Sequence, residues 1–168
     1  MKKIIQNSFS SDTSENTLAI ALLILRVVIG AMMLMHGLGK LSMLLGNDPI
    51  SFPDPLGIGL TASLALAVFA EVFCSIFLIL GIATRISALS LIVTMLIAAF
   101  LVHGNNGFAA QELAFLYLLI YLVIAIVGAG KYSIDNWISK KQLDNFVRQN
   151  LNRKELLPTM GLVSFGYK

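Results

Sequence analysis

Charged residues are scarce in this sequence. Only 12% of its 168 residues are Asp, Glu, Lys or Arg, whereas 57% are hydrophobic, and soluble domains carry roughly 25% charged residues. This composition excludes an ordinary soluble domain and predicts an integral membrane protein that forms one compact unit. The net charge of +3 does not indicate nucleic-acid binding, because the basic residues lie near the predicted membrane ends and form no groove-sized patch.

Residues that bind metals are scarce as well. Cys74 is the only cysteine, so an intramolecular disulfide, covalent c-type haem and a cysteine-held iron–sulfur cluster are excluded for this chain alone. The only histidines are His36 and His103. The four methionines between residues 32 and 43 lack the close spacing with histidine that a copper site needs. The sequence therefore predicts no metal site, and Cys74 is expected to be a small core residue.

Four apolar runs are long enough to cross a bilayer. They cover residues 18–35, 60–83, 86–102 and 113–129, and a spanning helix needs roughly 17–25 such residues. A stretch rich in Pro and Gly, residues 42–59, joins the first two runs and is expected to form an ordered outer loop. The pattern predicts an all-α fold, an integral membrane four-helix bundle with short turns between neighbouring helices.

Polar segments flank the predicted bundle. Residues 1–17 are expected to be a polar cytoplasmic N-terminus, residues 18–130 the transmembrane domain, and residues 131–168 a cytoplasmic amphipathic helix with a tail. In the last segment apolar residues recur at helical spacing between Lys140 and other basic residues. That helix is predicted either to lie on the inner leaflet or to pack under the bundle, and the sequence favours neither alternative.

The basic residues predict the orientation. Of the twelve Lys and Arg residues, ten fall on one side of the four spans, Arg26 lies within the first span, and Lys40 alone falls on the other side. The positive-inside rule then places both termini in the cytoplasm. The expected location is the inner (cytoplasmic) membrane, which the chain crosses several times.

Two ionisable residues are expected at bilayer depth. Arg26 lies eight residues into the first run, and Glu71 lies near the middle of the second. Because an unpaired charge at that depth costs at least about 3 kcal/mol, the sequence predicts that Arg26 and Glu71 pair between adjacent helices. Such a pair either marks a functional site or fixes the register of the two helices.

A second polar group is expected at the outer end of the bundle. His36 and Lys40 are four residues apart and share a helix face, while His103 and Glu112 bracket a short turn at the same depth. We predict that these four line one cavity under the outer loop, and that this cavity leads inward to the charge pair. In the alternative, each of the four meets water or headgroups separately.

Two tyrosines in the fourth span complete the set. Tyr117 and Tyr121 are one helical turn apart and could point inward. An interfacial position is expected for Tyr117, because tyrosine is enriched at the membrane–water boundary. Tyr121 is retained as a candidate cofactor-binding residue.

Several of these residues together resemble the DoxX family. The resemblance covers roughly residues 18–136. It is carried by Arg26, Gly30, the stretch His36-Gly37-Leu38-Gly39-Lys40-Leu41, Glu71, and the stretch GAGKYSID from Gly128 to Asp135. The family comprises small four-helix membrane proteins of bacteria and archaea. Some members are subunits of a thiosulfate:quinone oxidoreductase, others are grouped with membrane redox or stress-defence systems, and most have no assigned activity.

The first functional hypothesis is a quinone-linked redox subunit that works with a partner protein. A quinone needs an apolar slot reachable from lipid and polar groups for its carbonyls and protons, and nothing in the sequence carries electrons itself. The candidate catalytic residues are Arg26, Glu71 and His36, and the candidate cofactor-binding residues are His36, Lys40, His103, Glu112 and Tyr121.

Three alternatives from other classes remain. The chain could be a non-catalytic accessory or structural subunit of a larger membrane complex, with the charge pair fixing helix register. It could be a haem b protein in which His36 and His103 are axial ligands. It could be a small transporter with a water-filled route, although four spans are few for one. The expected partners are membrane lipid and either a partner protein or further copies of the chain.

Overall fold

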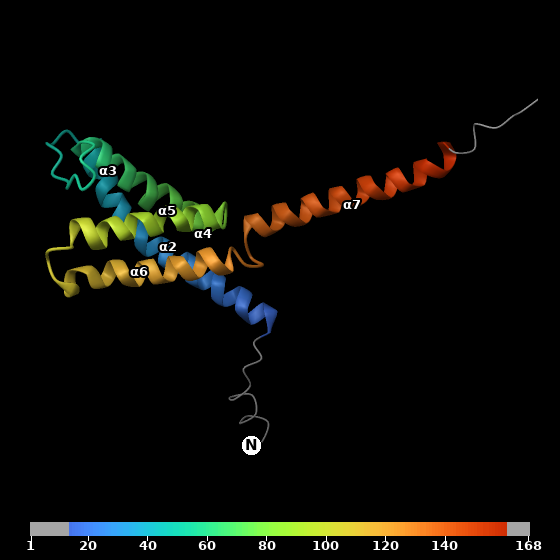
Figure 1. Ribbon diagram of the computed structural model, residues 1–168, viewed down its shortest axis with the longest axis horizontal. Coiled ribbons are helices and arrows are strands. Elements are labelled where there is room, and N and C mark those ends of the chain that lie inside the picture. The colour runs from blue at the N-terminus through green and yellow to red at the C-terminus, as the bar shows by residue number, and fades with distance from the viewer. Residues whose placement is uncertain (1–13, 161–168) are drawn as a thin grey trace, which may run out of the picture. The chain divides into compact units, whose positions relative to one another are not determined.

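The computed structural model describes residues 14–160, which are helical apart from their connections and contain no strand (Figure 1). The chain divides into a transmembrane unit that ends at Asp135 and a C-terminal unit that begins at Asn136, and each is described by itself. The helices in chain order are α2 (Glu15–Leu45), α3 (Leu60–Val68), the π-helix η1 (Phe69–Cys74), α4 (Ser75–Leu80), α5 (Thr84–Ile97), the π-helix η2 (Ala98–Val102), α6 (Phe108–Val127) and α7 (Ile134–Met160).

Four helices of the described residues are long and apolar enough to cross a membrane, which confirms the predicted fold class. They are α2, the continuous rod formed by α3, η1 and α4, the rod formed by α5 and η2, and α6. We call the end of this bundle where α4 stops and α5 starts the inner end, after the predicted topology. The opposite end, where residues 46–59 connect α2 to α3, is the outer end.

Two helices extend further than the sequence predicted. The first begins at Glu15 and continues to Leu45, because no proline interrupts the chain before Pro49, so His36 and Lys40 lie inside it. The fourth begins at Phe108 and therefore includes Glu112. These boundaries change which residues share a helix face.

Close helix packing fixes α2 against the second span. A Cβ atom at Gly30 would lie 2.6 Å from Cγ1 of Ile79, and one at Gly37 would lie 2.8 Å from the backbone carbon of Glu71. The two glycines therefore let the helices approach, as small residues do in membrane helix pairs. Figure 1 shows α2 running obliquely across the other spans. Its 31 residues exceed the roughly 20 that a span needs, and a tilt is the usual way for a long helix to fit a bilayer.

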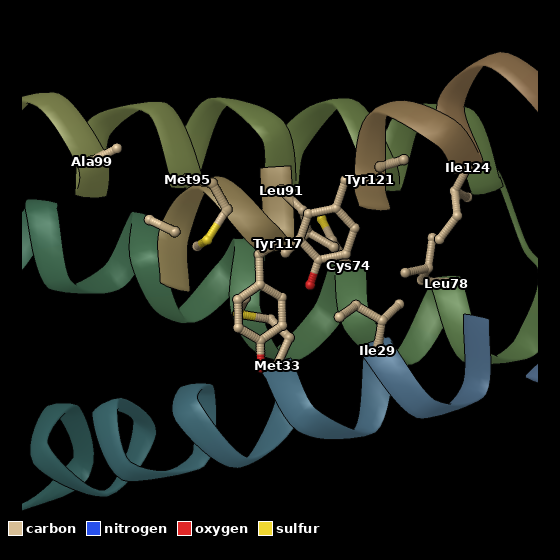
Figure 2. Packing of buried hydrophobic residues seen from close by; sticks show 12 residues of the cluster. Ile29, Met33, Cys74, Leu78, Leu91, Met95, Ala99, Tyr117, Tyr121 and Ile124 are labelled. Carbon is tan, nitrogen blue, oxygen red and sulfur yellow. The ribbon is translucent and has the colours of Figure 1, made fainter. Parts of the chain in front are cut away.

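The core lies between α2, the second span, α5 and α6, and Figure 2 shows its side chains. Tyr117 is 3% exposed and Tyr121 is fully buried, with ring centroids 6.0 Å apart. The interfacial position expected for Tyr117 is therefore wrong, because Ala114, Tyr117 and Tyr121 lie on the one face of α6 that packs against the bundle. Cys74 is buried in the same cluster, as predicted.

The C-terminal unit is helical from Asn136 to Met160. Trp137, Leu143 and Phe146 are exposed, and Nζ of Lys141 lies 5.2 Å from the centroid of the Trp137 ring. A helix in this region was predicted. Its amphipathic character, its place on the inner leaflet and the predicted domain boundaries stay predictions.

Candidate functional site

Arg26 is held at the inner end of the bundle. Its Nη1 donates a hydrogen bond to the carbonyl oxygen of Ala129, and its Nη2 donates to that of Tyr132 at 2.8 Å. The side chain is 1% exposed. The predicted pairing of Arg26 with Glu71 is therefore wrong, since the terminal guanidinium nitrogens are bound by the turn that follows α6.

Helix geometry explains this position. Side chains of an α-helix lean toward its N-terminus, so Arg26 reaches toward the inner end. Because α2 is oblique and begins before the apolar run, residue counting from position 18 placed Arg26 too deep. A Cβ atom at Gly81, where α4 stops, would lie 2.8 Å from Nη1 of Arg26. Arg26 thus lies level with the end of the second span.

Asp135 completes this structure at the inner end. Its carboxylate accepts hydrogen bonds from the backbone N–H groups of Ala83 at 2.8 Å and Thr84 at 2.9 Å, which caps the start of α5. Burial raises the pKa of Asp135, whereas the two N–H donors and the Arg26 charge lower it, and the pKa lies below its ordinary value of 3.8. We call Arg26, Gly81 and residues 128–135 the inner clasp, and its contacts join α2 and the start of α5 to the segment that follows α6.

Glu71 pairs instead with Lys40. The Lys40 Nζ donates to Oε1 of Glu71 in an ion pair that links α2 to η1. Glu71 is 2% exposed, and its Oε2 has no hydrogen-bond partner among the described residues. It lies eleven residues after Leu60 and nine before Leu80, so helix rise puts it about 16 Å from one end of its span and about 14 Å from the other.

Two π-helical segments border this ion pair. The segment η1 carries Glu71 itself, and η2 ends one residue before His103. Single π-helical turns inside α-helices are rare and occur often at functional sites, because the extra residue widens the turn and redirects side chains. The sequence did not reveal either segment.

A polar cavity of about 160 Å³ lies on one side of the ion pair. The side chains that give it polar character are those of His36, Lys40, Glu71, His103 and Tyr117. The His36 and Tyr117 rings meet edge to face with centroids 6.0 Å apart. The structure therefore brings His36, Lys40 and His103 together as predicted.

Two parts of the cavity prediction are wrong. Glu112 is exposed and does not line the cavity, because on α6 it faces away from Ala110, Ala114 and Tyr117, which do. The cavity reaches Glu71 but does not extend to Arg26, which belongs to the inner clasp. Tyr121 lies one turn deeper than Tyr117 and also does not line the cavity.

An apolar groove of about 370 Å³ lies on the other side of the ion pair. Its walls are residues of α3 and η1, including Phe69, and of α5 and η2, including Thr94. The outer loop covers it through Phe52, Pro55 and Leu56. Lys40, Glu71 and Ala98 are the residues that line both the groove and the polar cavity.

Asp54 fixes the loop that covers the groove. Its carboxylate accepts hydrogen bonds from the Ser63 hydroxyl at 2.6 Å and from the N–H groups of Gly59 at 2.7 Å and Ile58 at 3.1 Å. The Ser63 hydrogen bond and those N–H groups hold the pKa of Asp54 below its ordinary value. Phe52 stands over Lys40, with Nζ 5.6 Å from the ring centroid. The ordered outer loop predicted over residues 42–59 is thus found at residues 46–59, and its contact with the groove is an additional finding.

Comparison with known proteins identifies the family. A sequence model of DoxX matches residues 21–104. The chain belongs to the DoxX family. The matched range contains the ion pair, His36 and His103. Residues 128–135 of the inner clasp and Tyr117 lie beyond it.

Relatives of this DoxX protein include an uncharacterised protein of Haemophilus influenzae. It is 37% identical over 129 residues, which cover 70% of this chain and 90% of the relative. The inner membrane protein YqjF of Escherichia coli is 28% identical over 126 residues, which cover 73% of this chain and 95% of YqjF. No solved structure matches the chain.

Proposed function

We propose that this DoxX-family membrane protein is the quinone-binding subunit of an inner-membrane oxidoreductase. The observation that carries the proposal is the ion pair at the edge of the apolar groove. Cofactor sites are mostly apolar pockets of roughly 300–1,000 Å³ with a few polar groups that orient the ligand, and the groove has about 370 Å³. A quinone ring would occupy the groove, with one carbonyl at Lys40.

The ion pair still has hydrogen-bond donors and an acceptor available for such a ligand. The ammonium group of Lys40 has three N–H donors, and one of them serves Oε1 of Glu71. A second donor can bind a quinone carbonyl oxygen. The free Oε2 of Glu71 is an acceptor for a quinol hydroxyl, and its protonated form is a proton donor. The pair as a whole is neutral, which suits an uncharged ligand.

The proposed reaction is the reduction of quinone to quinol. Two electrons come from a redox centre of a partner protein and two protons pass by way of the Glu71 carboxyl, so that each carbonyl oxygen becomes a hydroxyl. The proposal assigns the electron donor to a partner protein, because the sequence has no CxxC or CxxCH motif that would mark an electron carrier of its own. The inner-membrane location is supported by the name of YqjF and by the basic residues.

The alternatives receive less support. In the haem b alternative His36 and His103 would enclose a porphyrin, but the cavity between them has about 160 Å³, which is below the roughly 300 Å³ of the smallest cofactor pockets. The accessory-subunit alternative explains the ion pair as a register lock but gives no role to the groove beside it.

Quinone binding tests the proposal directly. The full-length chain in lipid nanodiscs would be irradiated with an azido-quinone, and the labelled peptides would be mapped by mass spectrometry. We expect labelling of the groove, competition by a short-chain ubiquinone, and loss of labelling in Ala67→Phe, which fills the groove. The variant Lys131→Met, at the inner end, is the control and should label normally. No competed labelling of the wild-type groove would favour the accessory subunit.

A further inference from the structure

The polar cavity contains buried polar atoms that the described chain leaves unbonded. They are the hydroxyl of Tyr117 and Oε2 of Glu71, on side chains that are 3% and 2% exposed. Both side chains line the cavity. Because a buried polar atom without a hydrogen bond costs about 1–3 kcal/mol, these two atoms indicate that the cavity takes a polar ligand.

The cavity extends from the outer end to the ion pair. His103 and Ala110 line it where the third span ends and the fourth begins, and Tyr117 lines it seven residues further along α6. Seven residues of helix correspond to about 10 Å. The volume of about 160 Å³ holds several waters, since one water occupies about 30 Å³ in the liquid.

We propose that the polar cavity is a hydrated port through which Glu71 exchanges protons with the outer side. The charged and titratable groups that face Glu71 there are Lys40 and His36 from α2, His103 after η2, and Tyr117 from α6. Water in the cavity satisfies Oε2 of Glu71 and the Tyr117 hydroxyl. Histidine side chains act as proton shuttles in proteins, so the proposal gives His103 the transfer of protons at the mouth of the cavity.

This inference rests on the proposed function for the destination of the proton. Glu71 is accessible from the polar cavity on one side and from the apolar groove on the other. A proton that enters past His103 therefore reaches the carboxyl that faces the quinone. The protons for quinol formation are taken from the outer side, since the cavity is lined by His103 and Ala110 at that end and by no residue of the inner clasp.

Cysteine accessibility tests the hydration of the port. In a Cys74→Ser background, Ala114→Cys places a thiol in the cavity, and Leu116→Cys places one two residues away on the exposed face of α6. A charged, membrane-impermeant methanethiosulfonate would be applied to right-side-out and to inverted membrane vesicles. We expect Ala114→Cys to react at least about tenfold faster than Leu116→Cys, because the reacting thiolate forms in water and not in lipid.

The side of reaction is part of the result. Fast modification of Ala114→Cys in right-side-out vesicles alone is expected. Equal and slow modification of both cysteines would show a dry cavity and overturn the port, and fast modification only in inverted vesicles would overturn its direction.

Infrared spectroscopy then tests proton transfer. After a pH jump in nanodiscs, the carboxylate band that Glu71→Gln lacks should decay more slowly in His103→Phe than in wild type. An unchanged rate would remove His103 from the path. These readouts do not use quinone, so a reactive Ala114→Cys without azido-quinone labelling would reject the proposed function, while labelling with an unreactive Ala114→Cys would reject the port.

Discussion

Lys40 of α2 and Glu71 of η1 form an ion pair that separates a polar cavity from an apolar groove. The arrangement gives one carboxyl access to two environments of opposite polarity. The pair also connects the outer part of α2 to the middle of the second span, so its contribution to stability can be measured apart from its chemistry.

The first prediction concerns that pairing. Lys40→Met should destabilise the protein by up to about 3–5 kcal/mol, because it leaves the buried carboxylate of Glu71 unpaired. Glu71→Leu should cost less, because the Lys40 side chain is 30% exposed and its charge stays partly solvated. The double variant should recover part of the loss. Thermal unfolding in detergent measures all three. The matched control is Arg26→Leu combined with Glu71→Leu, whose losses should add, since those residues do not touch. Additive losses for Lys40 and Glu71 would contradict the pairing.

The second prediction concerns the contact of α2 with the second span. Gly37→Ala should destabilise by about 1–3 kcal/mol, because overpacking a tight contact forces a backbone shift, and its Cβ would lie 2.8 Å from Glu71 and Val72 atoms. Gly39→Ala is the control on the same helix, since nothing lies within 4 Å of its Cβ position. It should be neutral or stabilising by up to about 1 kcal/mol. Equal melting temperatures for the two variants would refute the close approach.

The third prediction concerns acid and the inner clasp. The pKa of Asp135 is lowered in the folded protein, so its stabilisation is fully present above the ordinary value and is lost as pH falls through the folded value. Asp135→Asn should lower stability at pH 7 by about 1 kcal/mol, as the loss of a helix cap does. Between pH 5 and pH 3 its melting temperature should fall less steeply than that of wild type.

Asp54 also has a lowered pKa, so its protonation in acid likewise destabilises the folded protein. Asp54→Asn is therefore measured beside Asp135→Asn over the same pH range. Parallel melting curves for wild type and Asp135→Asn would show that the carboxylate of Asp135 does not contribute in acid.

The fourth prediction concerns orientation. Alkaline phosphatase and green fluorescent protein fused at Asp48 and at the C-terminus should report opposite sides, with Asp48 outside. The reason is that the basic residues favour cytoplasmic termini. Three spans lie between Asp48 and the C-terminus, so reporters that place both positions on the same side would require an even number of spans between them and would contradict the four-helix arrangement.

The sequence predicted the fold well because the spans depend on hydropathy. Runs of apolar residues interrupted by turn residues are local signals, so the four spans and the outer loop could be anticipated. Helix ends were less accurate. Glycine, histidine and lysine between residues 36 and 40 are tolerated in a helix, and α2 continued through them to Leu45.

The charge pairing could not be derived from depth alone. Arg26 and Glu71 were matched because residue counting put both near the bilayer centre, but the tilt of α2 shifts the depth of every residue along it. One signal was available. His36 and Lys40 share a helix face with the neighbouring Gly37, whose close contact with Glu71 brings that face to the carboxyl. The covering of the groove by Phe52 could not be predicted, since it depends on the path of the outer loop.

The π-helical turn at η1 has a consequence for the length of the second span. A π-helical turn holds one residue more than an α-helical turn. Deleting one residue within Phe69–Cys74 would therefore restore α-helical bonding and keep the two halves of the span in nearly their present orientation, because the π-helical turn takes up the extra residue. The same deletion elsewhere in the span would rotate one half by about 100° relative to the other. Leu64 and Leu78, which are fully buried on either side, could then not both keep their contacts with the bundle. One-residue deletions in the second span are therefore expected to be tolerated for folding at η1 alone, where they would move Glu71.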